Sequence, residues 1–166
     1  MTAVLYYKGL LVADRATSCG GTMTKIGTRQ KLTFVYDRNK LVGAFAGAGS
    51  SDEVINVIEK AEFDEDFSTF RLPPKVNAPS STIIYGSLFK PDSITFFSGD
   101  ARVPVLIQPT NGIFSLGTGG DFAHAIAFAT GNVRKAMRTA VALNDGCAPP
   151  FDWINLHTQK HGTWSN

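Results

Sequence analysis

The sequence has few of the features that mark secreted, membrane-spanning or nucleic-acid-binding proteins. It contains only two cysteines, and its apolar runs are far shorter than the roughly 20 residues that a membrane helix needs. No basic leader precedes an apolar core at the N-terminus, so we expect no secretory signal. The basic residues are scattered and the formal net charge is +2, unlike the basic patch of a nucleic-acid-binding protein. We therefore expect a reducing compartment, either the cytoplasm or a virion assembled in one, with no membrane and no nucleic-acid partner.

What the sequence does contain is typical of a globular protein. Hydrophobic residues make up 43% and charged residues 18%, which suits a single compact domain over residues 1–166. The two cysteines, Cys19 and Cys147, are interpreted as small buried hydrophobes. The histidines have no metal-ligand spacing, and we expect neither a metal nor another cofactor.

Apolar periodicity predicts strands, one helix, more strands, two helices and a last strand. The alternation predicts strands at residues 3–8, 10–15, 31–36, 41–46, 82–89, 93–97, 103–107, 113–116 and 151–157. A turn at Lys8-Gly9 predicts a hairpin of the first two strands, and residues 37–39 have the turn chemistry that would join the next two. Helical spacing begins at Ser51 and runs through residues 51–62. Two later helices meet where Gly131 ends one and Asn132 caps the next.

Three segments lack either period. Residues 17–27 are rich in glycine, threonine and serine, and are expected to form a loop with short strand pieces. Residues 63–80 hold three prolines and are expected to form a loop with room for one short helical turn. Residues 157–166 are polar and are expected to be a mobile tail.

This order of elements predicts an α+β fold. Two antiparallel sheets packed face to face, with helices on the outside, would bury the apolar face of every element. The expected architecture is thus a four-layer αββα sandwich.

Thr2 is the first candidate for chemistry. An N-terminal threonine can attack a carbonyl carbon with its hydroxyl oxygen, while its own α-amine takes the proton. This requires that Met1 be removed, which is normal before a small second residue. Threonine at position two is common, so Thr2 alone carries little weight.

Several motifs support a role for Thr2. The opening stretch TAVLYYKGLLVADRAT resembles the start of proteasome β-subunits and of the bacterial protease HslV, and Asp14 and Thr17 match that pattern. The motif TRQKL matches the next part of the same family and places Lys31 at its catalytic lysine. The stretch LVGAFAGAGSSDE resembles the family's strand, glycine turn and helix start, with Gly47 at the oxyanion position.

The resemblance continues to the C-terminal part of the chain. The stretch FSLGTGGDFAHAIAFA is similar to the family's glycine turn and third helix, with Thr118 where the family has serine. The stretch ALNDGCAPPFDWINLH is similar to the end of its last long helix, with Asp145 on the acidic position. The matches occur in the family's order along almost the whole chain, which predicts the fold of the N-terminal-nucleophile (Ntn) hydrolases.

The resemblance also implies roles for these residues. A Lys31 ammonium near Thr2 would favour the uncharged amine and the ionised hydroxyl, and Asp14 would hold that ammonium. The Gly47 N–H would stabilise the oxyanion, a contact typically worth about 2.7–4 kcal/mol in other hydrolases.

Two further sets of residues are given roles by the same resemblance. Thr118 and Asp145 would orient the Thr2 amine and a water molecule. Phe45 and Gly49 would shape a side-chain pocket.

The sequence also departs from the family's pattern. Ala3 and Ala148 stand where the family commonly has hydroxyl groups, and the spacing between Asp14 and Lys31 differs slightly. Residues 63–80 are too short and too rich in proline for the family's second helix. We therefore expect a thinner helical layer there.

Three functions remain open. The first is a threonine-type peptidase subunit of a homo-oligomeric ring, for which the resemblance to HslV implies an ATP-dependent unfoldase partner. The second is a noncatalytic structural or assembly protein, such as a phage or virion component, in which a retained Met1 locks the Thr2 amine in a peptide bond. The third is an amidase acting on a nonpeptide substrate.

The Gly-Thr-Gly-Gly stretch at residues 117–120 also has two interpretations. It could bind phosphate at a helix N-terminus, but it lacks the full dinucleotide fingerprint. Close packing of a strand against a helix is the favoured interpretation.

Overall fold

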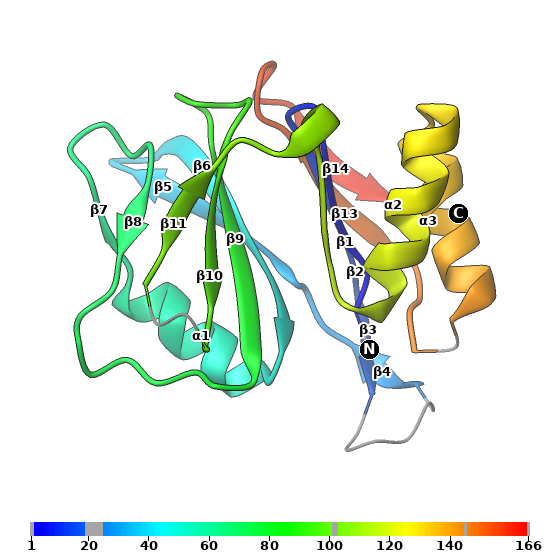
Figure 1. The fold of residues 1–166 in the computed structure, drawn as a ribbon, viewed down its shortest axis with the longest axis horizontal. Helices are drawn as coiled ribbons and strands as arrows, with labels where there is room; N and C mark the ends of the chain where they lie inside the picture. Colours follow the sequence, from blue (N-terminus) through cyan, green and yellow to red (C-terminus); the bar gives the residue numbers. More distant parts are fainter. Residues whose placement is uncertain (1, 19–24, 101–102, 145, 166) are drawn as a thin grey trace.

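The chain forms two five-stranded antiparallel sheets packed face to face with helices outside them (Figure 1). This architecture is seen in a computed structural model that describes residues 2–18, 25–100, 103–144 and 146–165. The predicted αββα sandwich is therefore confirmed.

The first sheet is built from the N-terminal and C-terminal parts of the chain. Its strands, in spatial order, are β12 (Ile113–Leu116), β1 (Val4–Tyr7), β2 (Leu10–Asp14), β13 (Phe151–Asn155) and β14 (His161–Trp164). Strands β1 and β2 form the predicted hairpin, because Lys8 and Gly9 adopt positive φ angles of 46° and 85° in its turn. The expectation of a mobile tail over residues 157–166 is wrong for β14, which pairs with β13 and buries part of its apolar surface against the sheet.

The second sheet is built from the middle of the chain. Its strands, in spatial order, are β11 (Val105–Ile107), β10 (Ile94–Ser98), β9 (Ser81–Ser87), β6 (Lys40–Gly49) and β5 (Leu32–Asp37). Arg38 and Asn39 make the turn between β5 and β6, both with positive φ, as the predicted turn chemistry requires. A separate two-stranded ribbon, β3 (Ala16–Ser18) and β4 (Lys25–Thr28), connects the sheets where a loop with short strands was expected.

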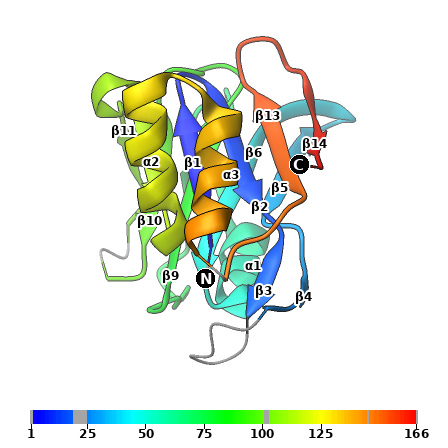
Figure 2. The same cartoon turned by 90° about the vertical axis from the view of Figure 1, so that its right-hand side faces the viewer.

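In the part of the chain that the structure describes, three α-helices cover the outer faces. Helices α2 (Thr118–Thr130) and α3 (Val133–Leu143) lie side by side on the first sheet, as Figure 2 shows. Gly131 ends α2 with a left-handed φ of 67°, and the Asn132 side chain accepts the Lys135 N–H at the start of α3. Helix α1 (Ser51–Lys60) lies on the second sheet. No helix in the described part of the chain is long and apolar enough to cross a membrane.

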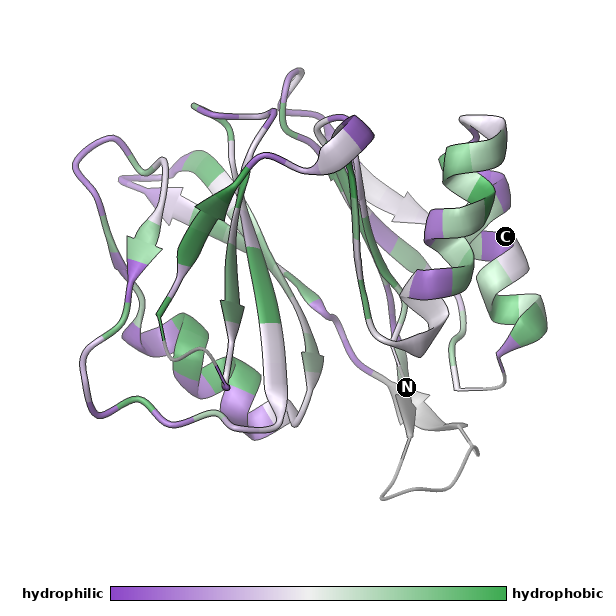
Figure 3. Ribbon diagram, in the orientation of Figure 1, coloured by the Kyte–Doolittle hydropathy of each residue, from purple (hydrophilic) through white to green (hydrophobic). Residues whose placement is uncertain are grey.

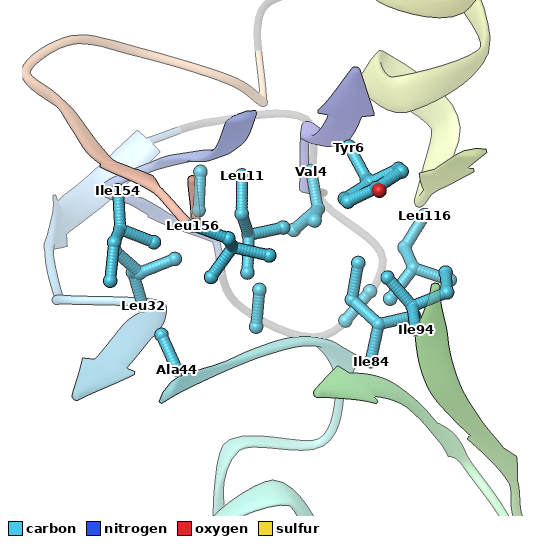
Figure 4. Close-up of a cluster of buried hydrophobic side chains, with 13 residues drawn as sticks. Val4, Tyr6, Leu11, Leu32, Ala44, Ile84, Ile94, Leu116, Ile154 and Leu156 are labelled. Carbon is cyan, nitrogen blue, oxygen red and sulfur yellow. The ribbon is translucent and has the colours of Figure 1, made fainter. Parts of the chain in front are cut away.

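The inner faces of the sheets form the central core, which Figure 4 shows at close range. Val4 and Tyr6 of β1 lie toward Ile84 of β9 and Ile94 of β10. Leu5, between them in sequence, points outward into the cluster under α2 and α3. This alternation is why β1 is almost fully apolar, since both of its faces are buried.

The segment after α1 covers the rest of the second sheet without a helix. Between residues 61 and 80 the described chain forms only the two-residue strands β7 (Glu62–Phe63) and β8 (Phe70–Arg71), joined by turns. The short helical turn allowed for here is absent, and the thinner helical layer is confirmed within the described residues. In Figure 3 this segment is a mixture of polar and apolar residues, unlike the green inner strands.

Aromatic side chains fill the space that a helix would occupy. Phe70 meets Phe45 at a ring-centroid distance of 5.1 Å, and Phe63 lies 5.2 Å from Tyr85. The Tyr85 hydroxyl donates a hydrogen bond of 2.9 Å to the Phe67 carbonyl. The outer face of the second sheet is therefore covered by large side chains on a segment without regular helical structure.

Candidate active site

Thr2 lies just before β1, at the end of the first sheet. Its carbonyl accepts the Gly119 N–H at 3.1 Å, and Thr2 as a whole is only 8% exposed. Gly117 approaches so closely, with φ of 75°, that a Cβ there would stand 2.3 Å from the Thr2 carbonyl oxygen. The glycine turn before α2 thus fixes the backbone of Thr2.

The other glycines of this turn explain its composition. A Cβ on Gly119 would lie 2.4 Å from the Cys147 sulfur, and one on Gly120 would lie 3.0 Å from the Val4 carbonyl oxygen. These short distances show close packing of a strand against a helix, which was the favoured interpretation of residues 117–120.

Asp14 is the hub of the site. It ends β2, is fully buried, and accepts four hydrogen bonds from described residues. Oδ1 accepts the Ala3 N–H and the Lys31 ammonium, both at 2.8 Å. Oδ2 accepts the Ala16 N–H at 3.0 Å and the Ala148 N–H at 3.3 Å. A buried carboxylate needs such partners, and these tie the start of β1 to three other segments.

Lys31 reaches Asp14 from the other sheet. It precedes β5, and its side chain is only 13% exposed. Because the ion pair is largely removed from water, loss of either partner would leave an uncompensated charge. The Lys31–Asp14 pair predicted from the motifs is therefore present, and it joins the two sheets beside Thr2.

A cleft of about 240 Å³ is lined by Thr2, by Lys31 and by residues of α1. One wall is the chain leading into β5, the floor is the end of β6, and the other wall is one face of α1. The remaining lining residues are Arg29, Gln30, Thr33, Gly47, Gly49, Ser51, Val54, Ile55 and Ile58. Among the described residues, a second depression of about 530 Å³ is lined by residues 89–93 and 106–108, and none of these is a predicted site residue.

Gly47 lies on the floor of this cleft, on β6. A Cβ at Gly47 would lie 2.7 Å from Cγ1 of Val54 on α1, so the glycine also lets the helix approach the sheet. Gly49 lines the cleft as expected, with φ of 107°. Phe45 does not line it, because its ring is buried in the aromatic cluster on the outer face of the second sheet.

Thr118 begins α2 and is not among the residues that line the cleft. Its Oγ1 accepts a hydrogen bond of 3.2 Å from the Asn144 side chain. Asn144 also accepts the Gly146 N–H at 3.1 Å, so Thr118 is linked to the turn that carries Ala148 to Asp14. Asp145, the other residue assigned to this region, lies outside the described residues.

Asn144 was missed by sequence reasoning. It follows the last helical residue, Leu143, where an ordinary helix end explains an asparagine equally well. Its position next to Asp145 in the quoted motif was the available signal.

Cys147 is buried directly behind the site. Burial, and secondarily the nearby Asp14 carboxylate, raise the pKa of its thiol to about 11. A thiol with so high a pKa stays neutral near pH 7 and is a poor nucleophile. The interpretation of Cys147 as a buried hydrophobe is confirmed, while Cys19 lies outside the described residues.

A second ion pair flanks the site. The Arg15 guanidinium donates to both oxygens of Asp152, from Nε at 2.7 Å and from Nη2 at 2.5 Å, and the pKa of Arg15 is raised mainly by this hydrogen bonding. Asp152 is 2% exposed and also accepts the Thr163 hydroxyl, so the pair fastens β13 and β14 next to β2. Among the described residues, no group of three or more His, Cys, Asp or Glu side chains is arranged to bind a metal.

Comparison with known proteins gives similarity in structure only. No model of a known protein family matches the chain, and no curated protein matches it in sequence. HslV from Trypanosoma brucei superposes with a TM-score of 0.65 at 21% identity, covering 92% of this chain and 97% of that one. The Gly-1 mutant of Anbu from Hyphomicrobium sp. strain MC1 has a TM-score of 0.69 at 14% identity, covering 98% and 87%. Thiobacillus denitrificans BPH in complex with epoxomicin has a TM-score of 0.60 at 13% identity, covering 93% and 97%.

These identities are low, and the similarity therefore establishes the fold. The chain has the Ntn-hydrolase fold that HslV and Anbu share.

Proposed function

We propose that this chain is a threonine-type peptidase subunit of a homo-oligomeric ring, with Thr2 as its nucleophile after removal of Met1. The observation that carries the proposal is the buried Asp14–Lys31 pair. Its carboxylate also accepts the N–H of Ala3, the residue after Thr2, at the end of a cleft that Thr2 and Lys31 line together. A buried ion pair is a poor source of stability, so its placement beside a hydroxyl at a cleft supports a chemical role.

The reaction follows from the groups present. The Thr2 oxygen attacks the carbonyl carbon of the scissile amide while its proton passes to the Thr2 α-amine. The carbonyl oxygen becomes an oxyanion, for which the Gly47 N–H is the proposed donor. The C–N bond then breaks, and the departing amine takes the proton from the α-ammonium. A water molecule hydrolyses the resulting ester on Thr2 and restores the free hydroxyl.

Lys31 and Asp14 would tune this chemistry. A fixed ammonium favours the uncharged α-amine, since a second positive charge nearby is unfavourable, and it favours negative charge on the Thr2 oxygen. Asp14 holds the ammonium in place at 2.8 Å. Thr118, with the undescribed Asp145, remains assigned to orienting the Thr2 amine.

The test combines intact mass with peptide hydrolysis. The natively purified chain should lack the mass of Met1, and it should hydrolyse fluorogenic peptides. Thr2→Ala should abolish hydrolysis with assembly unchanged, while Thr158→Ala, in the exposed β13–β14 turn, should behave as the parent. A chain without Met1 that hydrolyses no peptide would contradict the proposal.

Epoxomicin offers a probe that does not need a known substrate, because one structural neighbour is in complex with it. We expect a mass increase on the parent chain equal to one inhibitor molecule and none on Thr2→Ala. Sedimentation of the same samples measures whether the chain forms the proposed closed oligomer. Addition of a candidate ATP-dependent unfoldase, with folded substrate and ATP, tests that proposed partner.

The noncatalytic alternative keeps specific support. Ala148 meets Asp14 only through its backbone N–H and has no hydroxyl to offer the site, and the second sheet is covered by a single α-helix among the described residues. A native mass that includes Met1 would favour a structural or assembly role, including one in a virion. A cytoplasmic location is proposed with the peptidase and would be checked by cell fractionation.

A further inference from the structure

The charges around the cleft are unevenly balanced. Two cationic side chains line it, Lys31 and Arg29. Lys31 is paired with Asp14, and Arg15, whose carbonyl accepts the Arg29 N–H, is paired with Asp152. Arg29 also lines the cleft, yet no carboxylate of the described residues pairs with its guanidinium. The lining holds no acidic side chain to balance it.

Arg29 is nevertheless fixed in position at its backbone. Its N–H donates to the Arg15 carbonyl at 2.6 Å, which holds the chain between β4 and β5 against the start of β3. The residue is exposed, so the guanidinium faces solvent at the mouth of the cleft. A guanidinium presents several N–H donors in a planar fork that suits a carboxylate.

The opposite wall has the contrary character. Val54, Ile55 and Ile58 occupy one face of α1 and present apolar surface to the cleft. Val54 and Ile58 also pack on the aromatic cluster of the second sheet, whereas Ile55 belongs to none of the three apolar clusters. Ile55 is thus an apolar side chain at the cleft that is not needed to complete the core.

We infer that the cleft selects peptide segments that carry an apolar side chain and a neighbouring carboxylate, and that Arg29 is the residue that recognises the carboxylate. This rests on the proposed function for the identity of the ligand as a peptide. The apolar side chain lies against Ile55, and the acidic residue lies at the mouth, toward Arg29. Exposed ion pairs are worth about 0.2–1 kcal/mol, so the preference for Glu over Gln should be roughly 1.4-fold to 5-fold.

The experiment measures binding separately from hydrolysis. Fluorescein-labelled pentapeptides contain one Leu, and Glu, Gln or Lys occupies in turn each of the three positions before it. Their affinities are measured by anisotropy on the Thr2→Ala protein, which cannot turn them over. We expect Glu to bind better than Gln, and Gln better than Lys, at one position at least, with the difference shrinking in about 0.5 M salt because of screening.

Arg29→Glu is the deciding variant, made in the Thr2→Ala protein. It should reverse the order of Glu and Lys at the same position, whereas Lys40→Glu, an equal charge change at the exposed start of β6, should leave the order intact. Ile55→Asn should weaken binding of the Leu peptides relative to matched peptides with Ser in place of Leu. Thermal unfolding of each variant checks that the fold is unchanged.

The outcomes separate the two proposals. Absence of hydrolysis by the parent, with the expected Glu preference retained, would overturn the peptidase and leave the cleft assignment standing. The assignment of Arg29 would be overturned if Arg29→Glu left the order of affinities for the Glu and Lys peptides as it is in the Thr2→Ala protein. It would also be overturned if Lys40→Glu reversed that order as Arg29→Glu does. Failure of every peptide to bind up to millimolar concentration would overturn it as well.

Discussion

The two outer layers of the sandwich cover equivalent sheets by different means. Over the first sheet, α2 and α3 approach closely because their buried faces are mainly small, with Ala123, Ala127, Ala136 and Ala140 under the helices. Over the second sheet, α1 is joined by an irregular segment whose aromatic rings fill the remaining space. Where helices cover a sheet, small side chains let their backbones pack closely on it. Where the covering segment is irregular, large aromatic side chains fill the space instead.

The difference bears on function, because the cleft lies on the side of the single helix. One face of α1 forms its apolar wall, and the described residues hold no second helix on this sheet. Changes in the aromatic segment and in α1 should therefore affect stability and the cleft in separable ways.

The largest effect is expected for the aromatic cover. Phe70→Ala should lower the free energy of unfolding by about 3–5 kcal/mol, since the ring is 3% exposed and its removal leaves a cavity. Phe128→Ala on α2, where the ring is 63% exposed, is the control and should change stability by less than about 0.5 kcal/mol. Urea denaturation followed by circular dichroism measures both, and equal losses would mean that the aromatic segment does not serve as the layer.

The next effect concerns the contact between α1 and the floor of the cleft. Gly47→Ala should destabilise by about 1–3 kcal/mol, because its methyl group would overlap Val54. Val54→Ala should recover part of that loss when the two changes are combined. If the double variant lost as much unfolding free energy as the two single variants lose together, the crowding would not lie between Gly47 and Val54.

A pH dependence is expected on the α2–α3 side. Cys147 has its pKa raised from 9.0 to about 11, so the folded state keeps the thiol proton where the unfolded state loses it. The buried thiol therefore contributes its full share of folding stability below about pH 9, and this share is lost as the pH rises toward 11. Stability of the parent should fall more steeply over this range than that of Cys147→Ala, while Tyr6, whose pKa is raised to about 12, titrates in both. Parallel curves would contradict the assignment.

The smallest effect is expected for Tyr85→Phe. The change removes a hydrogen bond to the Phe67 carbonyl but keeps the ring, so the loss should be about 0.5–1.5 kcal/mol. Hydrogen exchange should rise in residues 64–69 more than in α2. Uniform exchange across both layers would mean that this bond does not hold the segment.

The order of elements and much of the site were predictable because they depend on local pattern and on motifs. The αββα order, the hairpin at Gly9, and the pairing of Asp14 with Lys31 were expected and are present. The strand at His161–Trp164 was not expected, because its sequence has little alternation of apolar and polar residues. The strand forms through its backbone pairing with β13. Residues 63–80 gave no sign of aromatic packing, since the partners Phe45 and Tyr85 lie on distant strands.

The sequence by itself determined which residues could serve chemistry: Thr2 at the start, Asp14 at a strand end, and a lysine and a glycine in the right order. Periodicity and turn residues act over a few positions, so they set elements and their ends. Only the tertiary structure decided that Arg29 remains without a carboxylate partner among the described residues while Lys31 and Arg15 have one, and that Ile55 faces the cleft while Phe45 is buried. Charge pairing and burial depend on which segments meet in space, and that is decided by the packing of the two sheets.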